Sequence, residues 1–417
     1  MAFLFPHFIL LFLFKLLLQV AFIAHTLFKK YHFRFNINMS DVVLASLLTV
    51  GKVLGLSGVG VVVARNLSHP AQSVPGVSYI ATKIFLPCFL CSHLTQELSF
   101  DVLFDRAYYW AVLLSLVPML CGFGMSYWVF RHVFLPQDKK AEFAGLLVLA
   151  CTFQNAVSFG LGILWNLDGV GWLAEDGAKE EAQTVLFLYN IFCSLFMWSG
   201  GTWIVKTEKE NELKIIAARE GKPPPDHPPL SLTRFAKESL TNVTVLASLV
   251  GIFIALCPPA KWLFADSYGG GILMGALETL GAGTVPFTLL MLGTNLIPPT
   301  PAKGAETKTW VVPPSLAVAV TVCRLVIVPL VTFSIFTLIE YALWDLPDDN
   351  PLAMPKGKPF RFMILLLSCA PTAVNTTAMC AMHRFKTAEY TQAIFVQYAS
   401  CILSTACWLT FFLWYIG

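Results

Sequence analysis

Long apolar runs recur along the whole 417-residue sequence, and they constrain its fold more than any other feature. A helix needs about 20 mainly apolar residues to cross the hydrocarbon core of a bilayer. Runs of about this length or longer lie near 2–28, 41–64, 76–95, 107–130, 144–165, 184–205, 239–258, 269–297, 312–343, 360–383 and 388–416. With 56% hydrophobic and 13% charged residues, the chain also has too little polar surface to coat a soluble globule. We therefore predict an all-α polytopic membrane protein with ten core transmembrane helices and one additional N-terminal hydrophobic segment.

A polar stretch divides the ten core runs into two groups of five. It reads "KTEKENELKIIAAREGKPPPDHPPLSLTRFAK", and its "KPPPDHPP" part cannot continue a helix because proline lacks the N–H donor and clashes with the preceding turn. An odd number of spans per half inverts the second half in the membrane, which is the topology of inverted-repeat transporters. We predict a hydrophobic anchor or signal at 1–40, a first five-helix repeat at 41–205, a linker loop at 206–238 and an inverted repeat at 239–417.

Basic residues indicate which side of the membrane the linker occupies. The predicted linker itself is rich in Lys, whereas the loop at 166–183 on the other side is acidic. Because cytoplasmic loops of membrane proteins carry an excess of Lys and Arg, we predict that the linker is cytosolic. The short segment "KKYHFRF" at 29–35 opposes this orientation but is outnumbered by the rest of the chain.

Polar residues interrupt the ninth core run, which reads "CAPTAVNTTAMCAMH" from 369 to 383. Pro371 removes a backbone donor and disfavours helical geometry at the preceding residue, so we expect the span to break near its middle. A broken backbone in hydrocarbon is tolerated only where its polar groups line a cavity or meet polar side chains. An alternative is a kinked helix whose threonine hydroxyls bond to the preceding turn, but this leaves the asparagine unexplained.

The fourth core run is interrupted in the same way, although it contains no proline. It reads "CTFQNAVSFGLGIL" from 151 to 164. Interrupted spans at equivalent positions of two inverted halves indicate a substrate site at the membrane midplane. Half-helix N-termini there would each present about half a positive charge, which suits an anion without a buried Arg or Lys. The predicted substrate-binding residues are Gln154, Asn155, Ser158, Pro371, Thr372, Asn375, Thr376 and Thr377.

Ionisable residues inside membrane spans are candidates for function. Glu278, between "GGGILMGAL" and "TLGAG", is the candidate coupling residue for a proton or cation, and the alternative is a structural partner for Lys52. Lys83 and Arg324 lie close enough to the ends of their runs for us to expect that their charges snorkel to the interface.

The sequence gives little support for metal binding or enzyme activity. The 11 cysteines lie in or beside apolar runs, and "CFLC" and "CAMH" have no second CxxC to complete a metal site. The segments outside the runs contain no paired carboxylates, no nucleophile with a base and no phosphate-binding loop. We therefore predict no enzyme activity, no metal or other cofactor and no nucleic-acid partner.

Five motifs occur in order between residues 41 and 416. They are "KIFLPCFLCSHL", "LETLGAGTVPFTLLMLGTNL", "VCRLVIVPLV", "CAPTAVNTTAM" and "YASCILSTACWLTFFLW". They are similar to the second, seventh, eighth, ninth and last spans of one family, and together they resemble the auxin efflux carrier superfamily and its PIN-LIKES proteins. The fourth run differs from the family pattern, because "FQNAVSFG" lacks the proline found at the helix crossing of the plasma-membrane carriers.

The resemblance implies a ten-span fold in which spans 1, 2, 6 and 7 form a scaffold. Spans 3–5 and 8–10 would form a moving transport bundle whose broken fourth and ninth helices cross. It also implies transport of auxin-type indole carboxylates across an intracellular membrane, with the short central loop favouring the endoplasmic reticulum over the plasma membrane. A cation-coupled organic-acid symporter of the same fold and a non-transporting receptor are the alternatives.

The expected partners are a small organic anion and the lipid bilayer. Glycine pairs at helix-packing spacing, Gly51 with Gly55 and Gly271 with Gly275, favour close helix contacts and a homodimer through the scaffold.

Overall fold

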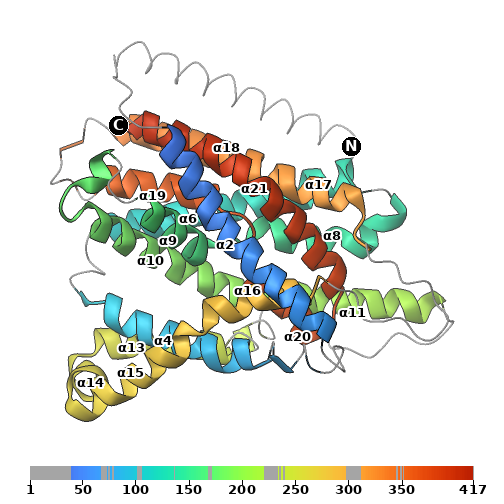
Figure 1. The fold of residues 1–417 in the computed structure, drawn as a ribbon, viewed down its shortest axis with the longest axis horizontal. Helices are drawn as coiled ribbons and strands as arrows, with labels where there is room; N and C mark the ends of the chain where they lie inside the picture. The colour runs from blue at the N-terminus through green and yellow to red at the C-terminus, as the bar shows by residue number, and fades with distance from the viewer. Residues whose placement is uncertain are drawn as a thin grey trace.

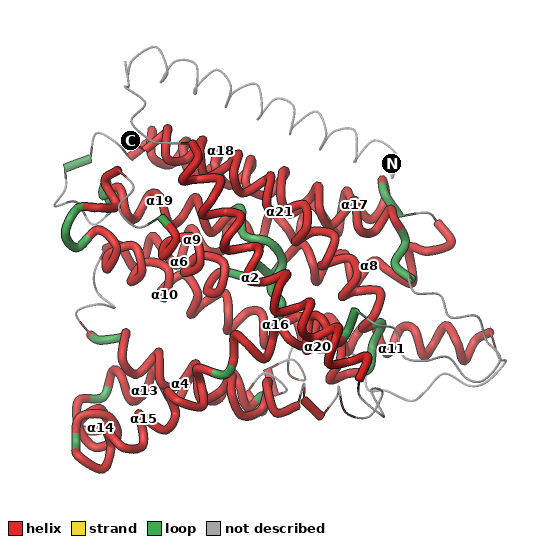
Figure 2. The backbone as a smooth tube through the Cα atoms, viewed as in Figure 1, coloured by secondary structure: helices red, strands yellow, loops and turns green. Residues whose placement is uncertain are grey.

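A computed structural model describes most of the chain after residue 38. The described residues are 39–66, 73, 76–77, 79–100, 106–135, 137–167, 171–219, 233, 236–237, 240–296, 311–343, 346–347, 350 and 352–416. They are almost entirely helical (Figure 2), and their one β-type pairing is an isolated bridge between Gln154 and Thr372. The all-α fold class is confirmed. The predicted anchor or signal at 1–40 lies outside the described residues except for Met39 and Ser40, the first two residues of α2.

The helices follow the order of the apolar runs. In the first half they are α2 (Met39–Asn66), η1 (Ala81–Phe85), α4 (Leu86–Glu97), α6 (Arg106–Gly124), η2 (Met125–Phe130), α7 (Arg131–Val133), α8 (Gln137–Thr152), α9 (Ala156–Asn166), η3 (Gly171–Ala174), α10 (Ala178–Phe196), η4 (Met197–Gly201) and α11 (Thr202–Arg219). In the second half they are α13 (Val243–Leu256), α14 (Pro258–Lys261), η5 (Trp262–Asp266), α15 (Tyr268–Ala282), α16 (Thr284–Thr294), α17 (Pro314–Val322), η6 (Cys323–Ile327), α18 (Val328–Leu343), α19 (Lys358–Ser368), α20 (Asn375–His383) and α21 (Thr387–Ile416).

Six described helical segments are long and apolar enough to cross a membrane. They are Leu47–Asn66, Tyr109–Val133, Ala178–Ile215, Tyr268–Thr294, Pro314–Leu343 and Thr387–Ile416. The pair Val243–Leu256 and Pro258–Asp266, bent by 104°, is a seventh if it forms one span. The fourth and ninth predicted runs do not appear as continuous spans because each is split into two short helices. The chain is a polytopic membrane protein, and ten spans in two inverted repeats stay a prediction.

The helices form two groups. In the first group α4 packs against α13 and α15, and α2 packs against α16. Figure 1 shows α4, α13, α14 and α15 together at one end of the molecule, with α16 and α2 leading toward the other helices. In the second group α10 packs against α6, α9 and α19, and α21 packs against α17 and α19. We call the first group the scaffold and the second the transport bundle, since they contain the spans expected of each.

The contact between α2 and α16 depends on two glycines. A Cβ atom on Gly293 would lie 1.8 Å from the carbonyl oxygen of Ser57, and one on Gly60 would lie 2.1 Å from that of Leu290. The Ser57 hydroxyl also lies 3.3 Å from the carbonyl oxygen of Leu289. Only hydrogen atoms on both glycines allow the two backbones to approach this closely.

Within the described residues, no second helix packs closely against the glycine pairs that were expected to form helix contacts. Cβ atoms on Gly51, Gly55 and Gly275 would meet nothing within 4 Å, and one on Gly271 would lie 3.7 Å from the Ala265 carbonyl oxygen. The expectation is wrong for contacts among these residues, because spacing along one helix does not show whether a second helix passes that face. The homodimer stays a prediction.

The predicted linker is partly helical. The helix that begins at Ala178 continues without interruption through η4 into α11, so residues 206–219 extend the fifth span. Most of the remaining linker, including its proline-rich part, lies outside the described residues.

Lys386, in the turn between α20 and α21, forms ion pairs with carboxylates on two other helices. Its Nζ atom lies 2.8 Å from Glu142 Oε1 on α8 and 2.8 Å from Glu212 Oε1 on α11. Burial lowers the pKa of Lys386. The hydrogen bonds and charges of the two carboxylates raise it by more than burial lowers it, so the pKa is above its usual value.

The glycine contact yields a test of the packing between α2 and α16. We expect Gly293→Ala to destabilise the protein by about 1–3 kcal/mol, because the methyl group forces the two backbones apart. The measurement is thermal unfolding of the purified protein in detergent. Gly275→Ala is the matched control, since its methyl group meets nothing within 4 Å. Equal melting temperatures for the two variants would contradict the packing argument.

Candidate substrate site at the crossing of two broken helices

The interrupted segments of the fourth and ninth spans pair with each other. The backbone N–H of Asn155 donates to the carbonyl oxygen of Pro371 at 2.8 Å. The backbone N–H of Ala373 donates to the carbonyl oxygen of Phe153 at 3.0 Å. The extended stretch between α8 and α9 therefore runs antiparallel to the one between α19 and α20. The predicted interruption of both spans and their crossing are confirmed.

Thr372 supports the crossing and does not face a cavity. It is fully buried, its hydroxyl donates to the Ala150 carbonyl oxygen at 2.6 Å, and its amide N–H donates to Gln397 Oε1 at 3.0 Å. These bonds satisfy backbone groups that the helix breaks leave without helical partners.

The two threonines of α20 bond locally. Thr376 and Thr377 donate to the carbonyl oxygens of Ala373 and Val374 at 2.6 Å and 2.7 Å, and Tyr390 donates to the Thr376 hydroxyl at 2.8 Å. Their hydroxyls thus bond to the preceding turn, as the alternative interpretation expected. Pro371, Thr372, Thr376 and Thr377 are all buried and do not line the cavity described next.

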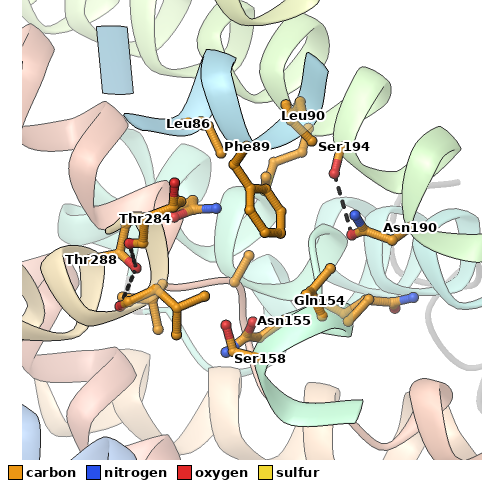
Figure 3. Close-up of a pocket in the computed structure, with 17 residues that line it drawn as sticks. Leu86, Phe89, Leu90, Gln154, Asn155, Ser158, Asn190, Ser194, Thr284 and Thr288 are labelled. Carbon is orange, nitrogen blue, oxygen red and sulfur yellow. Dashed lines mark hydrogen bonds between the residues drawn. The ribbon is translucent and has the colours of Figure 1, made fainter. Parts of the chain in front are cut away.

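A cavity lies where the crossing faces the scaffold. Half of the predicted binding residues line it, namely Gln154, Asn155, Ser158 and Asn375. Figure 3 shows the Phe89 ring between Thr284 and Thr288 on one side and Asn190 and Ser194 on the other. The complete lining is Leu86, Phe89, Leu90, Gln154, Asn155, Ala156, Val157, Ser158, Asn190, Ser194, Met197, Thr284, Val285, Thr288, Ala373, Val374 and Asn375.

The N-termini of both half-helices reach the cavity. The lining includes the first turn of α9, from Asn155 to Ser158, and the start of α20 at Val374 and Asn375. Neither helix is capped by the side chain of its N-cap residue. Each N-terminus presents about half a positive charge, so the local backbone field favours an anion.

The two asparagines at these N-termini differ in how many of their hydrogen-bonding groups are available to a ligand. Asn155 Nδ2 donates to the Tyr398 hydroxyl at 2.8 Å, and that hydroxyl donates to the Thr372 carbonyl oxygen at 2.9 Å. The half-buried side chains of Asn375 and Ser158 have no hydrogen-bond partner among the described residues, so both can bind a ligand. Asn155 still has one side-chain amide hydrogen and its amide oxygen for hydrogen bonds to a ligand.

Arg324 contradicts the snorkelling expectation. The side chain is fully buried in the π-helical turn η6, where Nε donates to the Ala370 carbonyl oxygen at 3.0 Å and the Nη2 group donates to Gln154 Oε1. Gln154 in turn donates to the Tyr189 hydroxyl. The crossing supplies acceptors in the interior, so the guanidinium has no need to reach the interface.

The other intramembrane charges lie away from the crossing. Glu278 is exposed on α15, where its Oε2 atom lies 3.5 Å from Gln96 Nε2, and it does not line the cavity. Within the described residues, Glu278 and Lys52 form no ion pair. Lys83 is half-buried in η1. A coupling role for Glu278 stays a prediction.

Four polar cavity residues were not predicted from the sequence. Asn190 and Ser194 lie four residues apart on α10, as do Thr284 and Thr288 on α16. That spacing places each pair on one helix face, and polar pairs on one face of an apolar run could have identified them.

These features define a polytopic helical membrane transporter, with a polar cavity where two broken helices cross. A family model described as "Membrane transport protein" matches residues 46–409. The chain therefore belongs to this family, which is that of the auxin efflux carriers.

Two relatives match this chain at low identity and over part of its length. The chain is 25% identical over 182 residues to the protein PIN-LIKES 4 of Arabidopsis thaliana, covering 43% of this chain and 40% of the relative. It is 27% identical over 155 residues to an uncharacterised transporter of Schizosaccharomyces pombe, covering 36% of this chain and 32% of the relative. The matched segments thus span less than half the length of either relative.

The Tyr398 hydroxyl offers a test of how the crossing is held. We expect Tyr398→Phe to destabilise the folded protein by about 1–3 kcal/mol, because the Thr372 carbonyl oxygen and the Asn155 amide lose a buried partner. The measurement is again thermal unfolding in detergent. Tyr341→Phe is the control, since Tyr341 is 73% exposed. A Tyr398→Phe variant as stable as the control would show that the crossing does not depend on this hydroxyl.

Proposed function

We propose that the protein is a secondary transporter of small organic anions, with auxin-type indole carboxylates as the substrate class. The observation that supports this most directly is the cavity itself, where two half-helix N-termini without side-chain caps face an apolar wall. Membership of the auxin efflux carrier family supports the substrate class.

The cavity offers separate places for the two ends of such a substrate. A carboxylate would lie at the N-termini of α9 and α20, accepting hydrogen bonds from Asn375 and Ser158. An aromatic ring would pack against Phe89, Leu86 and Leu90 of α4, with favourable apolar burial. The wall from α4 and α16 belongs to the scaffold, whereas the N-termini belong to the transport bundle. A movement of one group against the other would expose the bound anion to alternate sides of the membrane.

The membrane and the driving force belong to the same proposal. The short central linker favours the endoplasmic reticulum, and the plasma membrane is the alternative. The described residues that line the cavity include no carboxylate, which disfavours a tight site for a hard cation such as sodium. A monoanion can instead be driven by its own gradient and by the membrane potential.

The first test concerns the substrate itself. We expect vesicles with the reconstituted protein to accumulate labelled indole-3-acetate or benzoate, and Asn375→Ala to weaken binding by about 1–3 kcal/mol, or about 5- to 150-fold in Kd. The reason is the loss of a buried polar partner for the carboxylate. Asn66→Ala, at the end of α2, is the control. Unchanged affinity in a folded Asn375→Ala variant would contradict the site, and absence of any uptake would favour a receptor.

The second test concerns coupling. We expect uptake to be electrogenic and unaffected when choline replaces sodium, because the membrane potential contributes about 2.3 kcal/mol per charge per 100 mV. Glu278→Gln should change the rate without abolishing transport. Loss of uptake in choline would favour the cation-coupled symporter. An inactive Glu278→Gln variant that is folded and inserted would indicate obligatory proton coupling.

A further inference from the structure

Arg324 is a buried cation whose described partners are all neutral. It donates to the Ala370 carbonyl oxygen and to the Gln154 amide oxygen, and its Nη1 group has no hydrogen-bond partner among the described residues. None of the ion pairs found within the described residues involves Arg324. A guanidinium stays protonated in proteins, so the crossing contains a full positive charge without a described counter-ion. Such a charge is costly in a membrane interior and requires an explanation beyond packing.

The helix dipoles at the crossing determine how the Arg324 charge affects the local electrostatic field. Two helices begin there, α9 and α20, and two end there, α8 and α19. The positive N-termini and the negative C-termini largely cancel beyond the first turn, since each contributes about half a charge. Arg324 donates to the carbonyl oxygen of Ala370, the second residue after the end of α19, and so offsets the negative side of this arrangement. The crossing as a whole thereby becomes positive.

Gln154 connects this charge to the cavity. Arg324 does not line the cavity, but Gln154 does, and its amide oxygen accepts the Arg324 hydrogen bond. The guanidinium therefore lies one residue behind the cavity wall, where a ligand feels its charge without touching it. Two unit charges about 12 Å apart interact by about 1.4 kcal/mol at an effective dielectric constant of about 20, which is a factor of about ten in Kd.

We propose that Arg324 sets the charge selectivity of the cavity, favouring a carboxylate ligand over the neutral amide of the same shape. Arg324 determines specificity through its charge, without touching the ligand. This inference rests on the proposed function, because it presupposes that the cavity binds organic anions.

The test compares ligands that differ only in charge. Binding of indole-3-acetate and indole-3-acetamide, and of benzoate and benzamide, is measured on the purified full-length chain. We expect Arg324→Gln to weaken carboxylate binding about tenfold and to leave amide binding unchanged. Arg324→Lys, which keeps the charge, should restore most of the preference. Lys52→Gln, which removes an exposed positive charge from α2, is the matched control and should change neither affinity.

A second variant neutralises Arg324 without removing it. Gln154→Glu places a carboxylate where the guanidinium now donates to an amide oxygen, so the pair becomes neutral. We expect the same loss of carboxylate preference, and this variant tests the proposal even if Arg324→Gln does not fold.

The outcomes separate the inference from the proposed function. Equal losses for carboxylate and amide in Arg324→Gln and Gln154→Glu would assign Arg324 a purely structural role and overturn the inference. An unchanged preference in both variants would overturn it as well. A wild-type protein that fails to prefer carboxylates over amides would contradict the proposed function itself, a failure visible before any variant is made.

Discussion

The structure depends on satisfying backbone hydrogen bonds where no water is available. Breaking two helices inside a membrane exposes amide and carbonyl groups that cost several kcal/mol each if they stay unpaired. The protein pairs the two breaks with each other, through Asn155 with Pro371 and Ala373 with Phe153. This pairing fixes where α9 and α20 begin, and the positions of those two N-termini define the cavity.

The groups that support the crossing belong to the same bundle as the broken helices. Gln397 and Tyr398 come from α21, Tyr189 from α10 and Arg324 from η6, and all four side chains reach the crossing segments. The apolar side of the cavity comes from α4 and α16 of the scaffold. A movement between the two groups can therefore leave the crossing and its hydrogen bonds intact while changing access to the cavity.

Local chemistry in the sequence predicts the interruptions, because Pro371 and the Gln154–Asn155 pair act on their own backbone. It predicts Asn155, Ser158 and Asn375 at the cavity, since they follow directly from the breaks. The position of Arg324 could not be predicted, because a run as long as 312–343 does not show which part lies at the midplane. The close contact of Gly60 with α16 could not be predicted either, because it depends on residues around Leu290, 230 positions away in sequence.

If the proposed transport proceeds by movement of the bundle, a positive charge at the crossing affects the energetics of each step. If Arg324 gives the empty bundle one net positive charge, a bound monoanion neutralises it. The loaded bundle then crosses the membrane field at little electrical cost, and the empty bundle carries the charge on its return. One negative charge still moves per cycle, worth about 2.3 kcal/mol per 100 mV, but the membrane potential acts on the return step. The same charge that selects the anion would thus decide which half of the cycle responds to voltage.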